Sequence, residues 1–470
     1  MRGNPIIERY AASLLRPSQV WIAATIYAVA VAILLLVDAA IYQRHPGPGD
    51  PGVWVYLYNH FLIFQAFTLC VLGGFNSGAA IRNEMREKTY DFFRLLPMSA
   101  CRKTIGIVVG RNLLVLLMAA VNGGFLLAFG KLGGVAPALQ SQLALVLVAF
   151  ALLINLAALL GSVGASRKTG GPTASIAFVF AAIFATPFLI QAAGRIFDIQ
   201  SVDITRVFFY GLRVPLLVAM SLTALYFAVW VLVGIARAFD LGDEPLFTRG
   251  GAVLFLMGFE LAVLGFFRPQ AGEKSGLGYF FWTVSLVPLL LLPLGAMVKF
   301  DKYLERSWAF QRDGKVFGMR EMLRVSNVAV WLALLLVWGL FASVESLMLG
   351  MSVSDSLQLV LALLSFCLVF LLLAEVGIVY TPVNGKVMWL VGFVSLLILL
   401  LPLVASVVLN SETLHLYCLP GFFGELLGEA HAALPVDRSV WTVNLLLCVV
   451  PCALIWRRYR FALSARRSMV

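Results

Sequence analysis

Residues 21–37 read WIAATIYAVAVAILLLV, an uncharged apolar run that continues past Asp38 to Tyr42. A helix needs about 20 apolar residues to cross a bilayer, and this run meets that length. Similar runs recur along the whole chain of 470 residues, of which 61% are hydrophobic and only 13% are charged. A soluble domain has about 25% charged residues. The sequence therefore predicts an all-α polytopic membrane protein, which excludes a soluble enzyme, a disordered chain and a secreted disulfide scaffold.

Apolar periodic segments predict twelve transmembrane helices. The first six are expected at 20–42, 59–81, 105–130, 142–165, 173–193 and 213–236. The second six are expected at 250–267, 277–298, 325–345, 356–380, 387–409 and 439–456. The first run is too long for the hydrophobic region of a signal peptide, so we expect no cleaved leader.

The connections between these spans fall into two similar series. Each series has a long basic segment after its second span, at 82–104 and 299–324, and a longer segment before its sixth span, at 194–212 and 410–438. Parallel repeats of this kind are common in transporters. We therefore predict two six-helix halves, residues 1–237 and residues 238–470.

The distribution of positive charge predicts the orientation. The net charge is +11, from 35 Lys and Arg against 24 Asp and Glu, and the Lys and Arg concentrate in alternate loops. Because cytoplasmic loops carry the excess of these residues, we expect both termini in the cytoplasm and the chain in the cell membrane. The basic loops are expected to face anionic lipid rather than nucleic acid.

The first long cytoplasmic segment, residues 82–111, reads RNEMREKTYDFFRLLPMSACRKTIGIVVGR. It opens with charged residues, including Arg82 and Glu84, and continues into an apolar turn that Pro97 ends. Ser99 is placed to cap the helix that follows. A short amphipathic helix of this kind suits docking onto a soluble partner, with anchoring of the loop at the membrane surface as the alternative.

The stretch from Glu87 to Arg111 resembles the coupling-helix signature of type-2 ABC exporter permeases. In that family two acidic residues flanking a Thr, two apolar residues, a Pro and a Ser precede the third span and a Gly–basic pair. The matching residues here are Glu87, Thr89, Asp91, Phe92, Phe93, Pro97, Ser99, Gly110 and Arg111. Lys88 stands where the family often has Gly, a departure that puts the geometry of this turn in question.

The resemblance also implies an amphipathic elbow helix before the first span and short external helices before the sixth span of each half. Residues 6–16 fit the elbow helix, since an apolar face of Ile7, Tyr10, Ala11 and Leu14 lies opposite Glu8, Ser13 and Arg16. The two outer segments before the sixth spans have room for external helices.

The second long segment, KFDKYLERSWAFQRDGKVFGMREMLR at 299–324, keeps the length, the charge mix and an aromatic patch, but lacks the signature. We interpret it as a degenerate second coupling element, so that one chain supplies both halves, with a dimer of chains as the alternative. The coupling and ATPase-docking residues that the resemblance implies are Arg82, Glu84, Glu87, Thr89, Asp91, Phe92, Phe93, Pro97, Tyr303 and Trp308.

The chain carries no nucleotide-binding motif of its own. The nearest match to the phosphate-binding loop lies at 164–169, where it follows a membrane span with the wrong spacing. The resemblance therefore implies that ATP and Mg²⁺ are bound by separate ABC ATPase subunits, two per chain. We expect this chain to bind no cofactor or metal and not to be an enzyme, and its transported substrate is not readable from the sequence.

Two acidic residues fall within predicted spans, Glu260 midway in the seventh and Glu375 in the inner part of the tenth. A charged carboxylate at such a place costs about 3 kcal/mol on the insertion scale, so it faces the bundle interior, a partner or a wet cavity. Both are candidate transport-path residues, with a neutral structural carboxyl as the alternative. Asp38 and Glu345 lie near outer helix ends, where we expect them to be solvated.

Two other classes of protein stay open. An ion-coupled secondary transporter would use Glu260 or Glu375, although 82–104 lacks the Gly-x-x-x-Asp-Arg pattern of the major facilitator family. A membrane enzyme or an assembly protein is the other class, although only four His are present and the acidic and His residues of 410–438 match no metal-ligand spacing.

Two glycine pairs at a spacing of four residues, Gly74 with Gly78 and Gly106 with Gly110, lie in or beside the second and third spans. Small residues at this spacing let two helix backbones approach closely. We therefore expect helix packing at both pairs.

Overall fold

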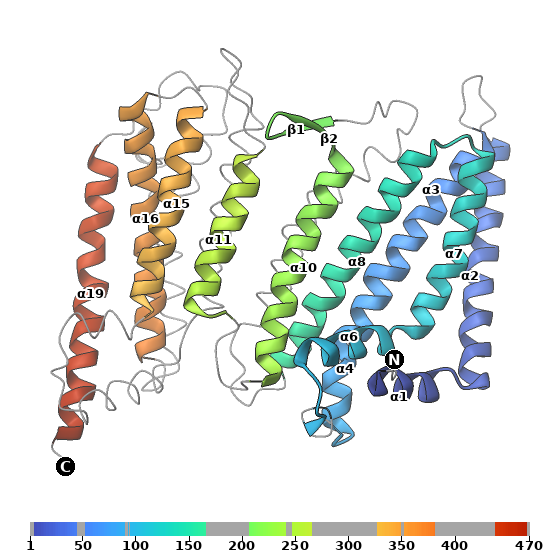
Figure 1. Ribbon diagram of the computed structural model, residues 1–470, viewed down its shortest axis with the longest axis horizontal. Coiled ribbons are helices and arrows are strands. Elements are labelled where there is room, and N and C mark those ends of the chain that lie inside the picture. Colours follow the sequence, from blue (N-terminus) through green and yellow to red (C-terminus); the bar gives the residue numbers. More distant parts are fainter. Residues whose placement is uncertain are drawn as a thin grey trace. The chain divides into compact units, whose positions relative to one another are not determined.

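The computed structural model describes residues 4–44, 52–89, 93, 95–165, 206–240, 247–265, 327–348, 352–380 and 438–467. Almost all of these residues are helical (Figure 1). The chain forms two compact units. Unit 1 consists of Met1–Val207 with Arg213–Leu246, and unit 2 consists of Phe208–Leu212 with Phe247–Val470.

Unit 1 holds the N-terminal helices and most of the described residues. Its helices are α1 (Pro5–Leu14), α2 (Pro17–Arg44), α3 (Val53–Ala66), η1 (Phe67–Leu72, a π-helix), α4 (Gly73–Arg86), α6 (Ala100–Arg111), α7 (Leu113–Leu132), α8 (Pro137–Ala165) and α10 (Leu216–Asp240). The described helices of unit 2 are α11 (Arg249–Leu264), α15 (Val328–Met348), α16 (Val353–Tyr380) and α19 (Arg438–Arg467).

Eight stretches of the described chain are long and apolar enough to cross a membrane. They are Pro17–Val37, Val53–Arg86, Leu113–Leu132, Pro137–Val163, Leu216–Phe239, Val328–Met348, Ser356–Gly377 and Thr442–Arg460. Each coincides with an expected span, and α11, at 16 residues, lies at the expected span 250–267. The all-α, membrane-spanning character is thus confirmed. The expected spans 173–193, 277–298 and 387–409 lie outside the described residues, as does 299–324, so the twelve-span repeat stays a prediction.

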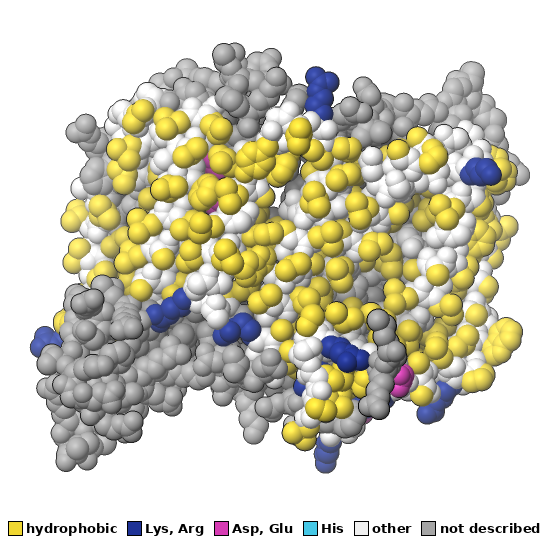
Figure 2. All heavy atoms as spheres, in the orientation of Figure 1, with side chains coloured by type: hydrophobic (Ala, Val, Ile, Leu, Met, Phe, Trp, Pro, Cys, Tyr) yellow, Lys and Arg dark blue, Asp and Glu magenta, His cyan; other side chains and the backbone are white. Residues whose placement is uncertain are grey.

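Many apolar side chains of these helices face outward. Helix α2 shows this most clearly, because Trp21 is 74% exposed and Leu36 is 70% exposed. Figure 2 shows hydrophobic side chains over the visible flanks of the helices, with Lys and Arg near the helix ends. In water such a surface would be unusual, whereas contact with lipid tails accounts for it.

The third expected span differs in form from the prediction of one helix over 105–130. The helix begins at Ala100, where Ser99 is the N-cap and its hydroxyl accepts a hydrogen bond from the Arg102 amide, as expected. It breaks at Asn112, whose φ of −99° and ψ of 13° separate α6 from α7. The side chain of Asn112 accounts for this break locally, since it donates to the carbonyl of Val108 at 2.9 Å in place of a regular continuation.

A β-hairpin lies where the resemblance led us to expect a short external helix. Strands β1 (Arg206–Phe209) and β2 (Leu212–Pro215) are joined by Tyr210 and Gly211, whose φ angles are 49° and 79°. Two consecutive residues with positive φ form the tight turn that matches strand twist. The expected helix is therefore wrong for 206–212, while 194–205 lie outside the described residues.

The core of unit 1 forms where α4 packs on α8. A Cβ built on Gly73 would lie 2.9 Å from Oδ1 of Asn155, and one on Gly74 would lie 3.1 Å from Ile154. A Cβ on Gly78 would meet Ala158 at an ordinary 3.6 Å. The first glycine pair thus permits close packing as predicted, with Gly73 and Gly74 as the tightest points.

A buried polar network supports this contact at the π-helix. A π-turn leaves backbone carbonyls without their usual helical partners. Nδ2 of Asn155 donates to the carbonyl of Leu69 in η1 at 3.1 Å, and its Oδ1 accepts from Ser77 at 2.8 Å and from Asn112 at 3.1 Å. Asn155 on α8 therefore links η1, α4 and the α6–α7 break through one side chain.

Helix α1 packs on α6 at the second glycine pair, Gly106 and Gly110. A Cβ on Gly106 would lie 2.7 Å from Nδ2 of Asn4, and a Cβ on Gly110 would lie 2.6 Å from Cδ2 of Tyr10. The Asn4 amide also donates to the carbonyl of Arg102 at 2.9 Å. The predicted close packing at this pair is confirmed, and α1 with its N-cap Asn4 is the partner.

We expect Gly110→Ala to lower the free energy of unfolding by about 1–3 kcal/mol, because the added methyl group pushes Tyr10 off α6. Gly124→Ala in α7 is the matched control, since nothing lies within 4 Å of its Cβ position. The control should be neutral or stabilising by up to about 1 kcal/mol. Thermal unfolding of both variants in one detergent tests this, and identical melting curves would contradict the close contact.

Candidate coupling site at the end of α4

The C-terminal turn of α4 determines where Glu84 lies. The helix ends at Arg86, after which Lys88 adopts a φ of 59°. The Lys88 amide donates to the carbonyl of Met85 at 3.1 Å, and the Thr89 amide donates to that of Glu84 at 2.8 Å. This pair of bonds is a Schellman motif, in which the residue with positive φ is usually Gly. Lys88 thus occupies the position of this motif at which Gly is usual.

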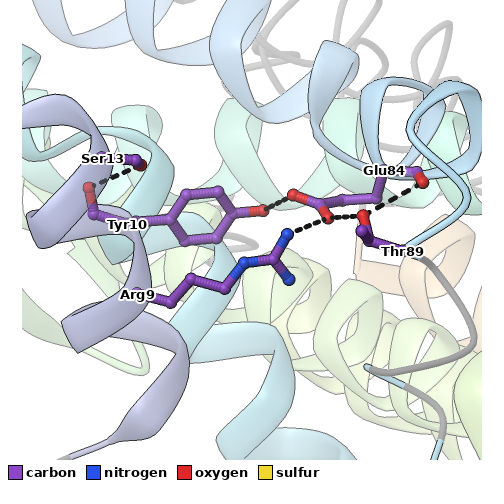
Figure 3. Close-up of polar contacts among 5 residues, drawn as sticks. All are labelled: Arg9, Tyr10, Ser13, Glu84 and Thr89. Atoms are coloured by element: carbon purple, nitrogen blue, oxygen red, sulfur yellow. Dashed lines mark hydrogen bonds and ion pairs between the residues drawn. The ribbon is translucent and has the colours of Figure 1, made fainter.

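Three side chains donate to the carboxylate of Glu84, which is only 4% exposed (Figure 3). Oε1 accepts from the Tyr10 hydroxyl at 2.8 Å, and Oε2 accepts from Nη2 of Arg9 at 3.0 Å and from the Thr89 hydroxyl. A buried carboxylate is tolerated only when such donors replace its water. Two of the donors lie on α1 and the third lies in the segment after α4, so Glu84 joins three parts of the chain.

Tyr10 is the aromatic centre of this cluster. Its ring stacks on Phe93 with centroids 6.3 Å apart, and the Arg111 guanidinium lies 5.8 Å from its centroid. The Arg9 guanidinium lies 4.9 Å from the Phe93 ring centroid, within cation–π range. Burial raises the pKa of Tyr10 above its usual value, and the Glu84 carboxylate raises that pKa further. The phenol therefore stays protonated and remains a donor at physiological pH.

The local sequence of α1 explains how Arg9 and Tyr10 reach Glu84. Asn4 is the N-cap, its side chain accepting from the Ile6 amide at 3.0 Å, and Pro5 occupies the first turn. Ile6 and Tyr10, four residues apart, are the buried residues of the helix. The sequence correctly placed Tyr10 on the apolar face, but it missed Ile6 as the second buried residue.

The predicted coupling residues separate into a buried and an exposed group. Glu84 and Phe93 are buried and Thr89 is half-buried beside them, whereas Arg82, Glu87 and Pro97 are exposed. The other predicted coupling residues, Asp91, Phe92, Tyr303 and Trp308, lie outside the described residues.

Sequence reasoning missed the partners that the buried group requires. Arg9 was not a candidate, and Tyr10 was assigned only to an apolar face. The one available signal for these partners was that a basic residue, Arg9, and a phenolic residue, Tyr10, are neighbours on a short helix with an N-cap. Nothing in the pattern shows which carboxylate they meet, because 74 residues separate Tyr10 from Glu84.

The predicted transport-path residues lie in unit 2. Glu260 on α11 and Glu375 on α16 are both fully buried. Nδ2 of Asn327 donates to Oε2 of Glu375 at 3.1 Å, and Arg249 interacts electrostatically with the same carboxyl. The expectation that Glu345 is solvated is wrong, since α15 turns it inward and it has no exposed surface. The side chain of Asp38 lies outside the described residues.

The fold and this cluster define the chain as an all-α integral membrane protein with a polar anchor between its N-terminal helix and α4. No family model matches the chain, and no curated protein or solved structure matches it.

Replacing Lys88 by Gly should stabilise the protein by about 1 kcal/mol, because Gly adopts positive φ without the steric cost that a Cβ incurs. Glu87→Gly is the matched control, since Glu87 has a φ of −82° and gains nothing from Gly. The midpoints of thermal unfolding report the difference. A destabilised Lys88→Gly variant would show that the turn has another conformation.

Removing the carboxylate of Glu84 should lower the free energy of unfolding by about 1–3 kcal/mol, since Glu84→Ala leaves the buried Tyr10 hydroxyl without its acceptor. Glu84→Gln, which keeps one oxygen acceptor, should cost less. Glu87→Ala, at an exposed neighbouring position, should change stability by no more than about 0.5 kcal/mol. Equal unfolding midpoints for the Glu84 and Glu87 variants would contradict the anchor.

Proposed function

We propose that this chain is the membrane permease of an ATP-binding cassette exporter, resembling the type-2 family. The observation that carries the proposal is the Glu84 cluster, because it lies at the start of the segment with the coupling signature. Among the described residues after α4, Glu87, Leu95 and Pro97 form an exposed side, and a soluble ATPase is the partner that the signature implies. The missing nucleotide-binding motif supports a separate ATPase.

The buried and exposed groups of the segment suggest how movement would pass into the membrane. Phe93 has no exposed surface, while Leu95, two residues on, is 82% exposed. An ATPase would contact the exposed side, where Glu87 and Pro97 also lie. Phe93 packs against Tyr10 and Arg9 of α1, and Thr89 donates to Glu84 of α4, so a push on the segment would reach α4 and α1 together. Such rigid transmission is typical of interface-driven switching.

The rest of the assembly follows from the same resemblance. ATP and Mg²⁺ would bind to two partner ATPases and none to this chain. The Glu84 cluster would face the cytoplasm together with both termini, in the cell membrane. Export is the direction that the family implies.

An ion-coupled secondary transporter is the second candidate, and a different observation favours it. Glu260 and Glu375 have no exposed surface in helices that are otherwise apolar. Acidic residues in that setting often hold a coupling ion. This candidate gives the exposed side of Glu87, Leu95 and Pro97 no role, which is why we prefer the permease.

The decisive experiment is affinity purification of the tagged chain from its native membrane, with mass spectrometry of the co-purifying proteins. A stoichiometric ABC ATPase is expected with the unaltered chain. Glu87→Lys should reduce its recovery at least tenfold, since the reversed charge lies on the exposed docking side.

Lys131→Glu is the matched control for this experiment, because it reverses an exposed charge near the far end of α7. It should leave the recovery of the ATPase unchanged. Absence of any ATPase from the unaltered chain, under conditions that keep known ABC complexes intact, would favour the secondary transporter. Full recovery with Glu87→Lys would reject the docking side.

A further inference from the structure

Two buried carboxyl groups in unit 2 have no role in the proposed coupling site. Glu260 lies on the buried face of α11, together with Phe255, Leu256, Phe259 and Val263. Glu345 lies on the buried face of α15, together with Trp331, Leu334, Trp338 and Ala342. The two helices pack against each other, and both carboxyls have no exposed surface. The interface of α11 and α15 therefore brings acidic groups into apolar surroundings.

The hydrogen bonds of these carboxyls set them apart from other buried acids. Among the described residues, none donates to either oxygen of Glu260 or of Glu345. Glu84 receives three donors and Glu375 receives one from Asn327. A buried carboxylate without donors is strongly disfavoured, whereas the protonated form is tolerated in apolar surroundings.

The two carboxyls also interact electrostatically with each other. Glu345 lies in the last turn of α15, and Glu260 lies just before the last turn of α11. The negative end of a helix dipole opposes a carboxylate there. On α11, α15 and α16, the other charged side chains that the structure describes are Arg249 and Glu375, which interact with each other.

We propose that Glu260 and Glu345 form a proton-binding site of unit 2, in which at least one carboxyl is protonated at neutral pH and exchanges its proton with water. A proton is the ligand that fits, because a hard metal cation needs about six oxygen ligands and no group of three acidic, His or Cys residues occurs in the described part of the chain. The Tyr210 hydroxyl donates to the carbonyl of Leu261, next to Glu260.

Infrared difference spectroscopy of the purified full-length chain tests this site without any ATPase, so the result is independent of the proposed function. The spectrum of the unaltered chain minus that of the Glu260→Gln, Glu345→Gln double variant should contain a protonated-carboxyl C=O band. That band should shift in D₂O. Each single Gln variant is measured in the same way, so that the test stands if the double variant does not fold.

Glu84→Gln is the matched control, because Glu84 is also buried but forms an ion pair with Arg9. Its difference spectrum should contain carboxylate bands and no protonated-carboxyl band. Carboxylate bands alone in the Glu260 and Glu345 differences would overturn the proposal. A protonated-carboxyl band that does not shift during long incubation in D₂O would also overturn it, since the pair would then be a fixed neutral contact.

Discussion

The burial of one carboxylate constrains the N-terminal part of this protein. Glu84 lies away from water, and Arg9, Tyr10 and Thr89 all donate to its carboxylate. These bonds hold α1 against the end of α4 and tie the chain directly after α4 to the same group. The turn in which Lys88 has a positive φ brings the Thr89 hydroxyl to the carboxylate. Helix position, turn geometry and the side exposed for docking all depend on the same group.

Close packing at glycines and hydrogen bonds from buried amides connect the rest of unit 1 to the Glu84 cluster. Gly73 and Gly74 bring α4 close to α8, and Asn155 then satisfies a carbonyl that the π-helix leaves free. In a membrane the hydrophobic effect contributes little between helices, so close packing and hydrogen bonds take its place. A movement of Glu84 would therefore also move α4 and the helices that pack tightly against it.

The buried carboxyl groups of unit 2 lie in two kinds of environment. Glu375 has an amide partner in Asn327, whereas Glu260 and Glu345 lie on buried apolar helix faces and interact with each other electrostatically. If the chain is an ABC permease, ATP supplies the energy for transport, and a proton on this pair would adjust the cycle rather than drive it. If the chain is an ion-coupled transporter, the same pair becomes the natural coupling site.

The sequence by itself determined the membrane class, the approximate positions of the described spans, the Ser99 cap and both close glycine contacts. These features depend on apolar length, local capping and residue size, which neighbouring residues reveal. Only the structure decided that Asn112 breaks the third span and that residues 206–215 form a hairpin, because a side-chain bond to Val108 and a two-residue turn override the apolar pattern. Only the tertiary structure decided that Arg9 and Tyr10 meet Glu84 and that Glu345 turns inward, because these depend on contacts between residues far apart in the chain, and no local pattern encodes which helix face will meet which partner.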